Sequence, residues 1–157
     1  MRRTLWLVTL VAALVAAAGA SASPVESESG TSSAVSATTF TIPLSGPGGT
    51  GDALLALNPG GKVCYVIQVT LTTEGDVPQE PPASGLGNAH IHALATGGIA
   101  VPLDASFTSL GDGMFIAADC VRSDKDAVRA VLADPEQYYL NIHTASFPGG
   151  AVSGGLA

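Results

Sequence analysis

The amino-acid sequence predicts an all-β domain, an antiparallel sandwich or closed barrel of seven or eight short strands with one short helix. Composition supports this class, because only 12% of the residues are charged and 19 of the 157 are glycine. Such a chain suits short strands and tight turns better than a bundle of long helices. Patterning supports it too, because short apolar or alternating runs recur between clusters of glycine and proline, and no internal repeat is present.

The expected strands are segments in which apolar side chains alternate with polar ones or form brief continuous runs. They cover residues 38–44, 53–57, 62–72, 89–94, 97–103, 114–118, 137–144 and 152–156. In 62–72, the residues Val63, Tyr65 and every second residue after them share one face, which is expected to point at the core. Residues 46–51 are expected to form a turn, and the proline-containing residues 74–87 a surface loop.

One helix is expected over residues 124–133, with Ser123 as its N-cap and Asp126 as a weak capping-box partner. Its apolar side chains share one face, which is the pattern of a helix packed on a core. These side chains are Ala127, Val128, Val131 and Leu132. Pro135 ends the helix, because proline disfavours a helical conformation in the residue before it.

The first 22 residues have the three parts of a secretory signal peptide. Arg2 and Arg3 supply the charged start and residues 5–18 the apolar centre, and cleavage is expected after the small residues that end at Ala22. The apolar run is shorter than the roughly 20 residues that a membrane-spanning helix needs, so removal is expected rather than anchoring. The paired arginines leave a twin-arginine export route open as an alternative.

Three parts are therefore expected: a signal peptide at 1–22, a disordered linker at 23–37 and one domain at 38–157. The linker prediction rests on small and polar residues with almost nothing large to bury. We expect the mature domain to be secreted, either extracellular or in the cell envelope, with no membrane attachment after signal cleavage.

The charge balance excludes some partners. The net charge of the whole chain is −7, and it becomes −9 once Arg2 and Arg3 are removed. The remaining basic residues are scattered, so no basic patch is available to bind the phosphates of nucleic acids or anionic lipids. The sequence therefore predicts no nucleic-acid partner and favours cations or basic surfaces, with an extracellular or cell-envelope protein as the expected class of partner.

Cys64 and Cys120 are the two cysteines, an even number in a chain expected to be exported. We interpret them as a disulfide, because disulfides persist in oxidising compartments. Such a bond would stabilise the fold by roughly 3 to 4 kcal/mol. Free thiols, one of them a metal ligand, are the alternative, although metal-binding cysteines usually occur in close pairs.

All three histidines fall in two strand-like segments. His90 and His92 lie two positions apart, so on a strand their imidazoles point to the same side while Ile91 faces the core. His143 shares a face with Asn141 near the end of a later expected strand. Whether these two strands are neighbours is not set by the sequence.

If they are neighbours, three neutral imidazoles converge on one patch, with Asn141, Tyr139 or a nearby acid supporting the ligands. An H-x-H pair on a strand places two zinc or copper ligands in many β proteins, so we predict a copper or zinc site at His90, His92 and His143. Three histidines leave one coordination position open, as in catalytic or transport sites. The alternative is a polar cluster held by hydrogen bonds alone.

The sequence lacks the motifs of a serine hydrolase, a phosphate-binding loop and an EF-hand. No Gly-x-Ser-x-Gly elbow is present, and Ser146 near His143 has no assigned acid or oxyanion donor, so a hydrolase is not favoured. The glycine-rich residues 46–49 are not followed by the Lys-Ser/Thr pair that holds a phosphate. The acidic residues lack EF-hand spacing, which leaves only weak calcium binding. The sequence therefore predicts no catalytic residue and does not favour an enzyme.

Five segments resemble the CHRD domain, which is named for chordin and is common in secreted bacterial proteins. They are residues 54–59, 63–65, 89–92, 135–144 and 147–151. The Tyr-Tyr-Leu-Asn-Ile-His-Thr block followed by Phe-Pro-Gly-Gly is the most specific part, and the resemblance runs from about Thr39 to the C-terminus. One departure is that the family often has an Arg-Gly pair after Phe-Pro-Gly-Gly, whereas Ser153 precedes Gly154 here.

The resemblance implies an immunoglobulin-like β-barrel with a distant likeness to copper/zinc superoxide dismutase, where an H-x-H strand also carries metal ligands. The chain has too few histidines for the dimetal centre of a dismutase. Because the family has no settled biochemical function, the expected function is a non-catalytic extracellular binding module. The alternative is a metal-binding protein, with copper or zinc on the three histidines and a dismutase-like redox or metal-handling role.

Overall fold

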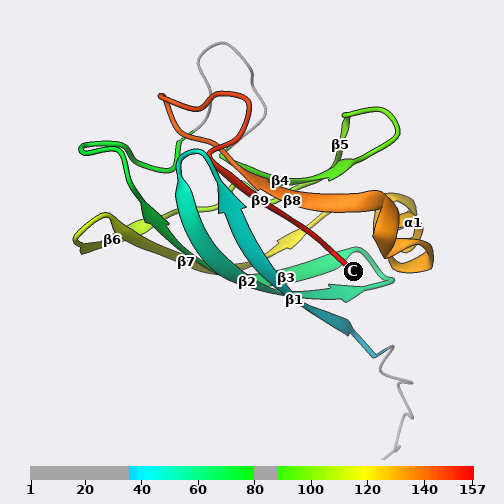
Figure 1. The fold of residues 1–157 in the computed structure, drawn as a ribbon. Helices are drawn as coiled ribbons and strands as arrows, with labels where there is room; N and C mark the ends of the chain where they lie inside the picture. Colours follow the sequence, from blue (N-terminus) through cyan, green and yellow to red (C-terminus); the bar gives the residue numbers. More distant parts are fainter. Residues whose placement is uncertain (1–35, 80–87) are drawn as a thin grey trace, which may run out of the picture. The chain divides into compact units, whose positions relative to one another are not determined.

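The computed structural model describes residues 36–79 and 88–157, which belong to one compact unit, Ser33–Ala157. The predicted signal peptide, residues 23–35 of the predicted linker and residues 80–87 of the predicted loop lie outside the described residues. The described part is one antiparallel sheet of nine strands that curls into a half-barrel around a single core (Figure 1). The prediction of an all-β antiparallel fold with one short helix is confirmed.

The elements are short and mostly connected as hairpins. In chain order they are β1 (Thr38–Gly46), β2 (Gly49–Asn58), β3 (Lys62–Leu71), β4 (Ala89–Ala93), β5 (Ile99–Pro102), β6 (Thr108–Gly111), β7 (Met114–Arg122), α1 (Lys125–Ala133), η1 (Pro135–Gln137), β8 (Tyr138–Ile142) and β9 (Val152–Gly155). Across the sheet the strand order is β5-β4-β8-β9-β1-β2-β3-β7-β6. Three pairings join segments that are distant in the sequence: β3 with β7, β4 with β8, and β1 with β9.

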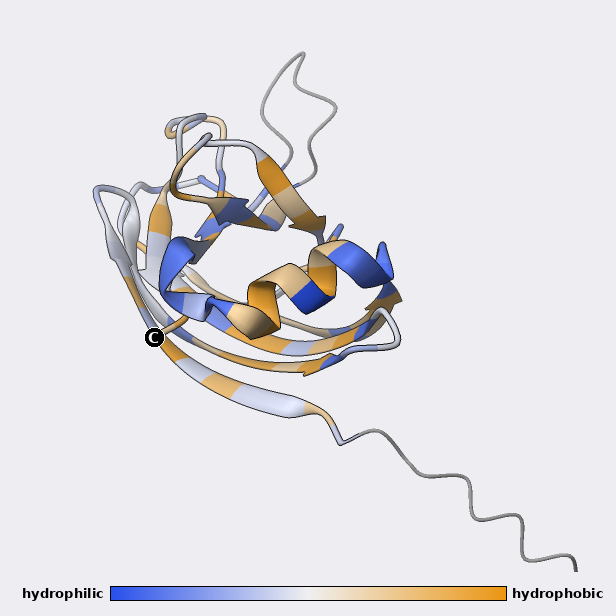
Figure 2. Ribbon diagram, turned by 90° about the vertical axis from the view of Figure 1, so that its right-hand side faces the viewer, coloured by the Kyte–Doolittle hydropathy of each residue, from blue (hydrophilic) through white to orange (hydrophobic). Residues whose placement is uncertain are grey.

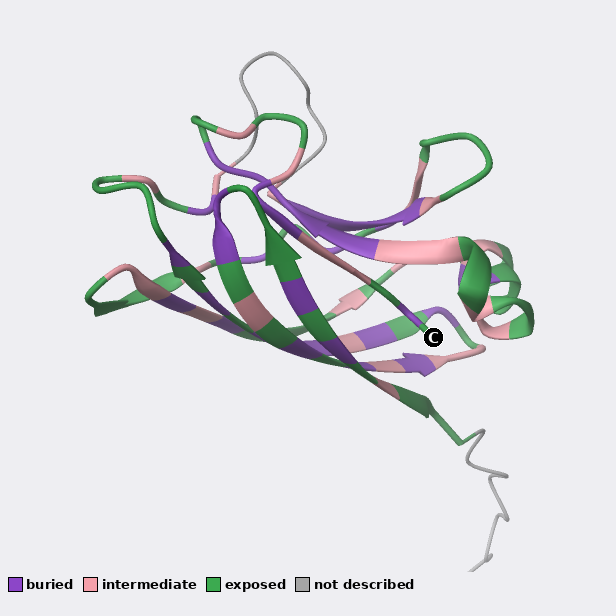
Figure 3. Ribbon diagram, in the orientation of Figure 1, coloured by how far each residue is buried: buried purple, intermediate pink, exposed green. Residues whose placement is uncertain are grey.

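The core lies on the inner face of the curled sheet. In β3, buried and exposed residues alternate with Val63 and Tyr65 inside, as predicted, and Figure 3 shows the same alternation along its neighbours. Leu140 of β8 is fully buried in the other half of the sheet. The helix contacts both β2 and β5 and buries Val128 and Val131, so its predicted apolar face packs between the two halves (Figure 2).

The helix begins one residue later than predicted, because its N-cap is Asp124 and not Ser123. Oδ1 of Asp124 accepts hydrogen bonds from the backbone N–H groups of Asp126 at 2.9 Å and Ala127 at 2.8 Å. Serine and aspartate are both good caps, so the sequence contains two adjacent candidates. The capping-box role predicted for Asp126 is therefore wrong. No helix among residues 36–79 and 88–157 is long and apolar enough to cross a membrane.

The predicted turn over residues 46–51 is shorter in the structure, because β1 ends at Gly46 and β2 begins at Gly49. At Gly49, φ is +151° and an added Cβ would lie 2.0 Å from the carbonyl oxygen of Thr70 in β3. Only glycine allows this backbone and this close approach of two strands. A glycine that resembles a turn signal therefore marks a tight strand contact here.

The ninth strand, β6, was not predicted, which is why the expected number of strands was seven or eight. All four of its residues are exposed, so it has no alternation of buried and exposed side chains that a sequence pattern could reveal. The strand β7 also extends four residues beyond the predicted end at Ala118, and it therefore includes Cys120.

Candidate metal centre

The two segments that carry histidines are neighbours in the sheet. The strand β4 pairs antiparallel with β8, so that His90 lies opposite Asn141 and His92 lies opposite Tyr139. His143 follows the last residue of β8 by one position. The structure thus brings the three predicted ligand residues together, on the opposite face of β4 from the buried Ile91.

The three imidazoles meet through their Nε2 atoms. The Nε2 atom of His90 lies 2.8 Å from that of His92 and 2.9 Å from that of His143. One ligand atom from each ring lies within 4.8 Å of the others. The exposed fractions are 0% for His90, 9% for His92 and 4% for His143, so the cluster is shielded from bulk solvent.

Two backbone carbonyl groups fix the orientation of the outer rings. Nδ1 of His92 lies 2.9 Å from the carbonyl oxygen of Gly97, and Nδ1 of His143 lies 2.9 Å from that of Pro148. A carbonyl oxygen only accepts, so each Nδ1 carries the hydrogen and donates it. In a neutral imidazole the other nitrogen is then an acceptor. Both rings therefore turn an Nε2 lone pair toward Nε2 of His90.

The hydrogens of three neutral rings cannot satisfy both short contacts. Nε2 of His90 carries at most one hydrogen, which it can direct at His92 or at His143. At least one of the two N···N contacts therefore brings lone pairs together unless a cation lies among the rings. A metal ion resolves this conflict, because it accepts a lone pair from each imidazole.

Burial lowers the pKa of His143 below the ordinary histidine value. The hydrogen bond to the carbonyl group of Pro148 opposes this shift, and the nearby His92 adds to it. The net effect favours the neutral ring, since burial penalises the charged form. An extra proton on His143 is therefore a poor substitute for a metal ion as the cation of this cluster.

The predicted supporting residues Asn141 and Tyr139 both contact the cluster. Nδ2 of Asn141 donates a hydrogen bond to the carbonyl oxygen of Gly149 at 3.3 Å and lies 3.4 Å from Nε2 of His143. The ring of Tyr139 stacks on that of His92, with centroids 5.0 Å apart and planes 17° from parallel. Together they limit the movement of the two outer imidazoles.

The loop after His143 was missed as part of the site, because backbone carbonyl groups leave no pattern in a sequence. At Gly150, φ is +129° and an added Cβ would lie 2.3 Å from Oδ1 of Asn141. The same loop is tied at Thr144, whose hydroxyl donates a hydrogen bond to Oδ2 of Asp76 at 2.6 Å. The Phe-Pro-Gly-Gly sequence was the available signal, since glycine often marks a special backbone conformation.

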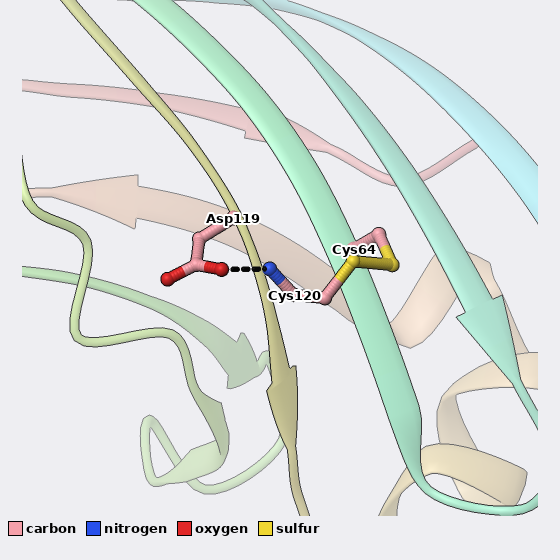
Figure 4. The surroundings of a disulfide bond; sticks show 3 residues. All are labelled: Cys64, Asp119 and Cys120. Carbon is pink, nitrogen blue, oxygen red and sulfur yellow. Dashed lines mark hydrogen bonds between the residues drawn. A yellow bond between two sulfur atoms is a disulfide. The ribbon is translucent and has the colours of Figure 1, made fainter.

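Cys64 and Cys120 form a disulfide, which confirms the predicted pairing over the free thiols (Figure 4). The two residues lie directly opposite each other on β3 and β7, and the backbone N–H of Cys120 donates to the carboxylate of Asp119 at 2.7 Å. These strands are in the other half of the strand order from β4 and β8. The disulfide therefore links β3 to β7 covalently and takes no part in the histidine cluster.

The family comparison covers both the sheet and the cluster. A family model described as the CHRD domain matches residues 18–156, a range that contains every described strand and all three histidines. Searches of curated proteins and of solved structures gave no match. The chain belongs to the CHRD domain family.

Proposed function

We propose that this protein is an exported, non-catalytic CHRD module that binds one copper or zinc ion through His90, His92 and His143. The observation that carries the proposal is the fixed direction of the outer rings. Each donates Nδ1–H to a backbone carbonyl group and turns Nε2 to within 2.9 Å of Nε2 of His90. Metal-ligating histidines are typically held in this way, by a hydrogen bond from the nitrogen that does not bind the ion.

The chemistry of the donors selects the class of ion. Imidazole nitrogens suit zinc and copper, whereas calcium and magnesium prefer oxygen ligands. A bound ion would supply Lewis acidity or, in the case of copper, one-electron chemistry. With only three histidines in the chain, the cluster provides for one ion, so we place a dismutase-like redox role second to metal binding and metal handling.

We also propose that the module acts outside the cytoplasm and binds an extracellular or cell-envelope protein. The disulfide supports the location, because such bonds persist in oxidising compartments. The net charge of −7, or −9 once Arg2 and Arg3 are removed with the expected signal peptide, favours a partner with a basic surface, an attraction that salt should weaken. Capture of a specific envelope protein by the mature domain at low salt is expected, and recovery of nothing above background would remove this part of the proposal.

Elemental analysis tests the metal site. The mature protein is purified from an exported preparation without a histidine tag, beside a variant with His90→Ala and His92→Ala. We expect about one copper or zinc ion per wild-type chain and loss of that ion in the double variant. Tyr139→Phe is the matched control, because it keeps the ring against His92 and should keep the ion. Absence of metal from the folded wild-type protein, even after incubation with both ions, would overturn the proposal.

A further inference from the structure

We propose that the cluster is a tetragonal copper(II) site rather than a tetrahedral zinc site. The inference rests on the proposed function and names the ion that the same three histidines select. It follows from the relative placement of the rings, which are not spaced equally. His90 takes part in both short Nε2···Nε2 contacts, at 2.8 Å and 2.9 Å.

The ring centres show the same inequality. The centroid of His90 is 4.4 Å from that of His92 and 4.7 Å from that of His143. The centroids of His92 and His143 are 6.4 Å apart. His90 is therefore the middle member of the cluster, and each of the other two imidazoles is closer to His90 than to the other.

These separations discriminate between two coordination geometries. For an ion about 2.0 Å from each nitrogen, tetrahedral ligation places every pair of nitrogens about 3.3 Å apart and every pair of ring centres about 5 Å apart. A square plane places neighbouring nitrogens about 2.8 Å apart, neighbouring ring centres about 4.4 Å apart and opposite ring centres about 6.3 Å apart. The cluster has two neighbouring pairs and one opposite pair, so it matches three corners of a square with His90 in the middle.

The fold resists a change from one geometry to the other. A tetrahedral ion would require His92 and His143 to approach each other by more than about 1 Å while both move away from His90. Each of the two is held through Nδ1 by a separate loop carbonyl group, Gly97 for one and Pro148 for the other. Moving the rings would weaken both hydrogen bonds. A site whose ligands are held in place favours the ion whose preferred coordination geometry matches their positions.

Copper(II) is the ion that fits this arrangement and these donors. It prefers square-planar or tetragonal ligation by nitrogen and oxygen, and it stands above zinc in affinity for nitrogen sites of the same kind. Zinc prefers four ligands at the corners of a tetrahedron. Three imidazoles would fill three corners of the copper plane, which leaves the fourth for water or another small oxygen ligand.

Two spectroscopic measurements on the metal-free mature protein test this inference. After addition of one equivalent of copper(II), the electron paramagnetic resonance spectrum should be axial, with hyperfine splitting from three nitrogens. After addition of cobalt(II), the visible absorption should be weak, because strong bands are specific to tetrahedral cobalt. Val66→Thr, a change at an exposed position of β3 in the other half of the strand order, should reproduce both results. His143→Ala should remove one nitrogen from the copper spectrum.

The outcomes separate this inference from the proposal on which it depends. Intense tetrahedral cobalt bands with a rhombic copper spectrum would overturn the tetragonal site and leave the three-histidine metal site standing. Failure of the folded protein to bind any of copper, zinc and cobalt would overturn both. In competition, zinc should fail to displace copper at a hundredfold excess, and displacement near equal concentrations would also contradict the copper assignment.

Discussion

His143 donates its Nδ1–H to the carbonyl oxygen of Pro148 across 2.9 Å, and this contact determines which ring nitrogen faces the cluster. The donor is beside the end of a strand and the acceptor belongs to the loop that follows. The conformation of that loop is therefore part of the proposed metal centre, although no loop side chain lies among the three imidazoles.

Gly150→Ala should weaken both the fold and the proposed metal site. A Cβ at this position would lie 2.3 Å from Oδ1 of Asn141, on a backbone whose φ is +129°. We expect the free energy of unfolding to fall by about 1–3 kcal/mol and the metal affinity to fall with it. Gly149→Ala is the control, because nothing lies within 4 Å of its Cβ. Chemical denaturation and metal titration of both variants make the comparison, and equal behaviour would show that the loop does not shape the site.

Asn141→Leu should reduce metal affinity without removing a ligand. The change deletes the hydrogen bond from Nδ2 to Gly149 and the contact at 3.4 Å with Nε2 of His143. Loss of such a supporting residue typically costs about 10–100-fold in affinity, and that reduction is expected in a competitive titration against a chelator. An unchanged affinity in a correctly folded variant would assign Asn141 to loop packing alone.

Replacing Cys64 and Cys120 together by serine should destabilise the fold and leave the proposed metal site unchanged. The disulfide closes a loop between two cysteines with a sequence separation of 56. Its loss should therefore lower the free energy of unfolding by roughly 3 to 4 kcal/mol. Because the bond joins β3 and β7, away from β4 and β8 in the strand order, the metal content per folded chain should be unchanged. Loss of metal at a temperature where the variant remains folded would contradict this separation of roles.

Stability should decline in alkaline solution through Tyr65. Burial, followed by the charges of Asp119 and Asp104, raises the pKa of its hydroxyl above the ordinary value of 10.0, and the hydroxyl donates a hydrogen bond to the carbonyl oxygen of Leu103 at 3.3 Å. The unfolded chain therefore loses this proton first, so the contribution is complete below pH 10 and is lost as the pH rises through the folded-state pKa. The free energy of unfolding, measured by denaturation across this pH range, should fall more steeply for the wild type than for Tyr65→Phe. Parallel curves for the two proteins would refute the prediction.

Much of the fold could be predicted because it follows from local patterns. The alternation through Val63 and Tyr65 is set by the period of a strand, and Val128 with Val131 by that of a helix. The exposed strand β6 could not be predicted, since its residues have no buried face. The glycines around Gly49 were also misleading, because a close strand contact and a turn both require glycine.

The three histidines of the cluster could be named from the sequence, but their geometry could not. The shared direction of His90 and His92 follows from strand periodicity. Their convergence with His143 depends on the pairing of β4 with β8, a contact between distant segments that no local pattern specifies. The roles of the carbonyl groups of Gly97 and Pro148 could not be predicted for a different reason. Every residue has a backbone carbonyl group, and only the folded backbone shows where each carbonyl group points.

X-ray absorption spectroscopy of the metal-loaded mature protein tests the central claim most directly, because it reports the atoms bound to the ion. A three-histidine site predicts nitrogen scatterers at about 2.0 Å together with the outer-shell scattering of imidazole rings, and both should fall when His90 is replaced by alanine. A shell of oxygen atoms without imidazole scattering, unchanged in that variant, would show that the ion binds elsewhere and would contradict the account.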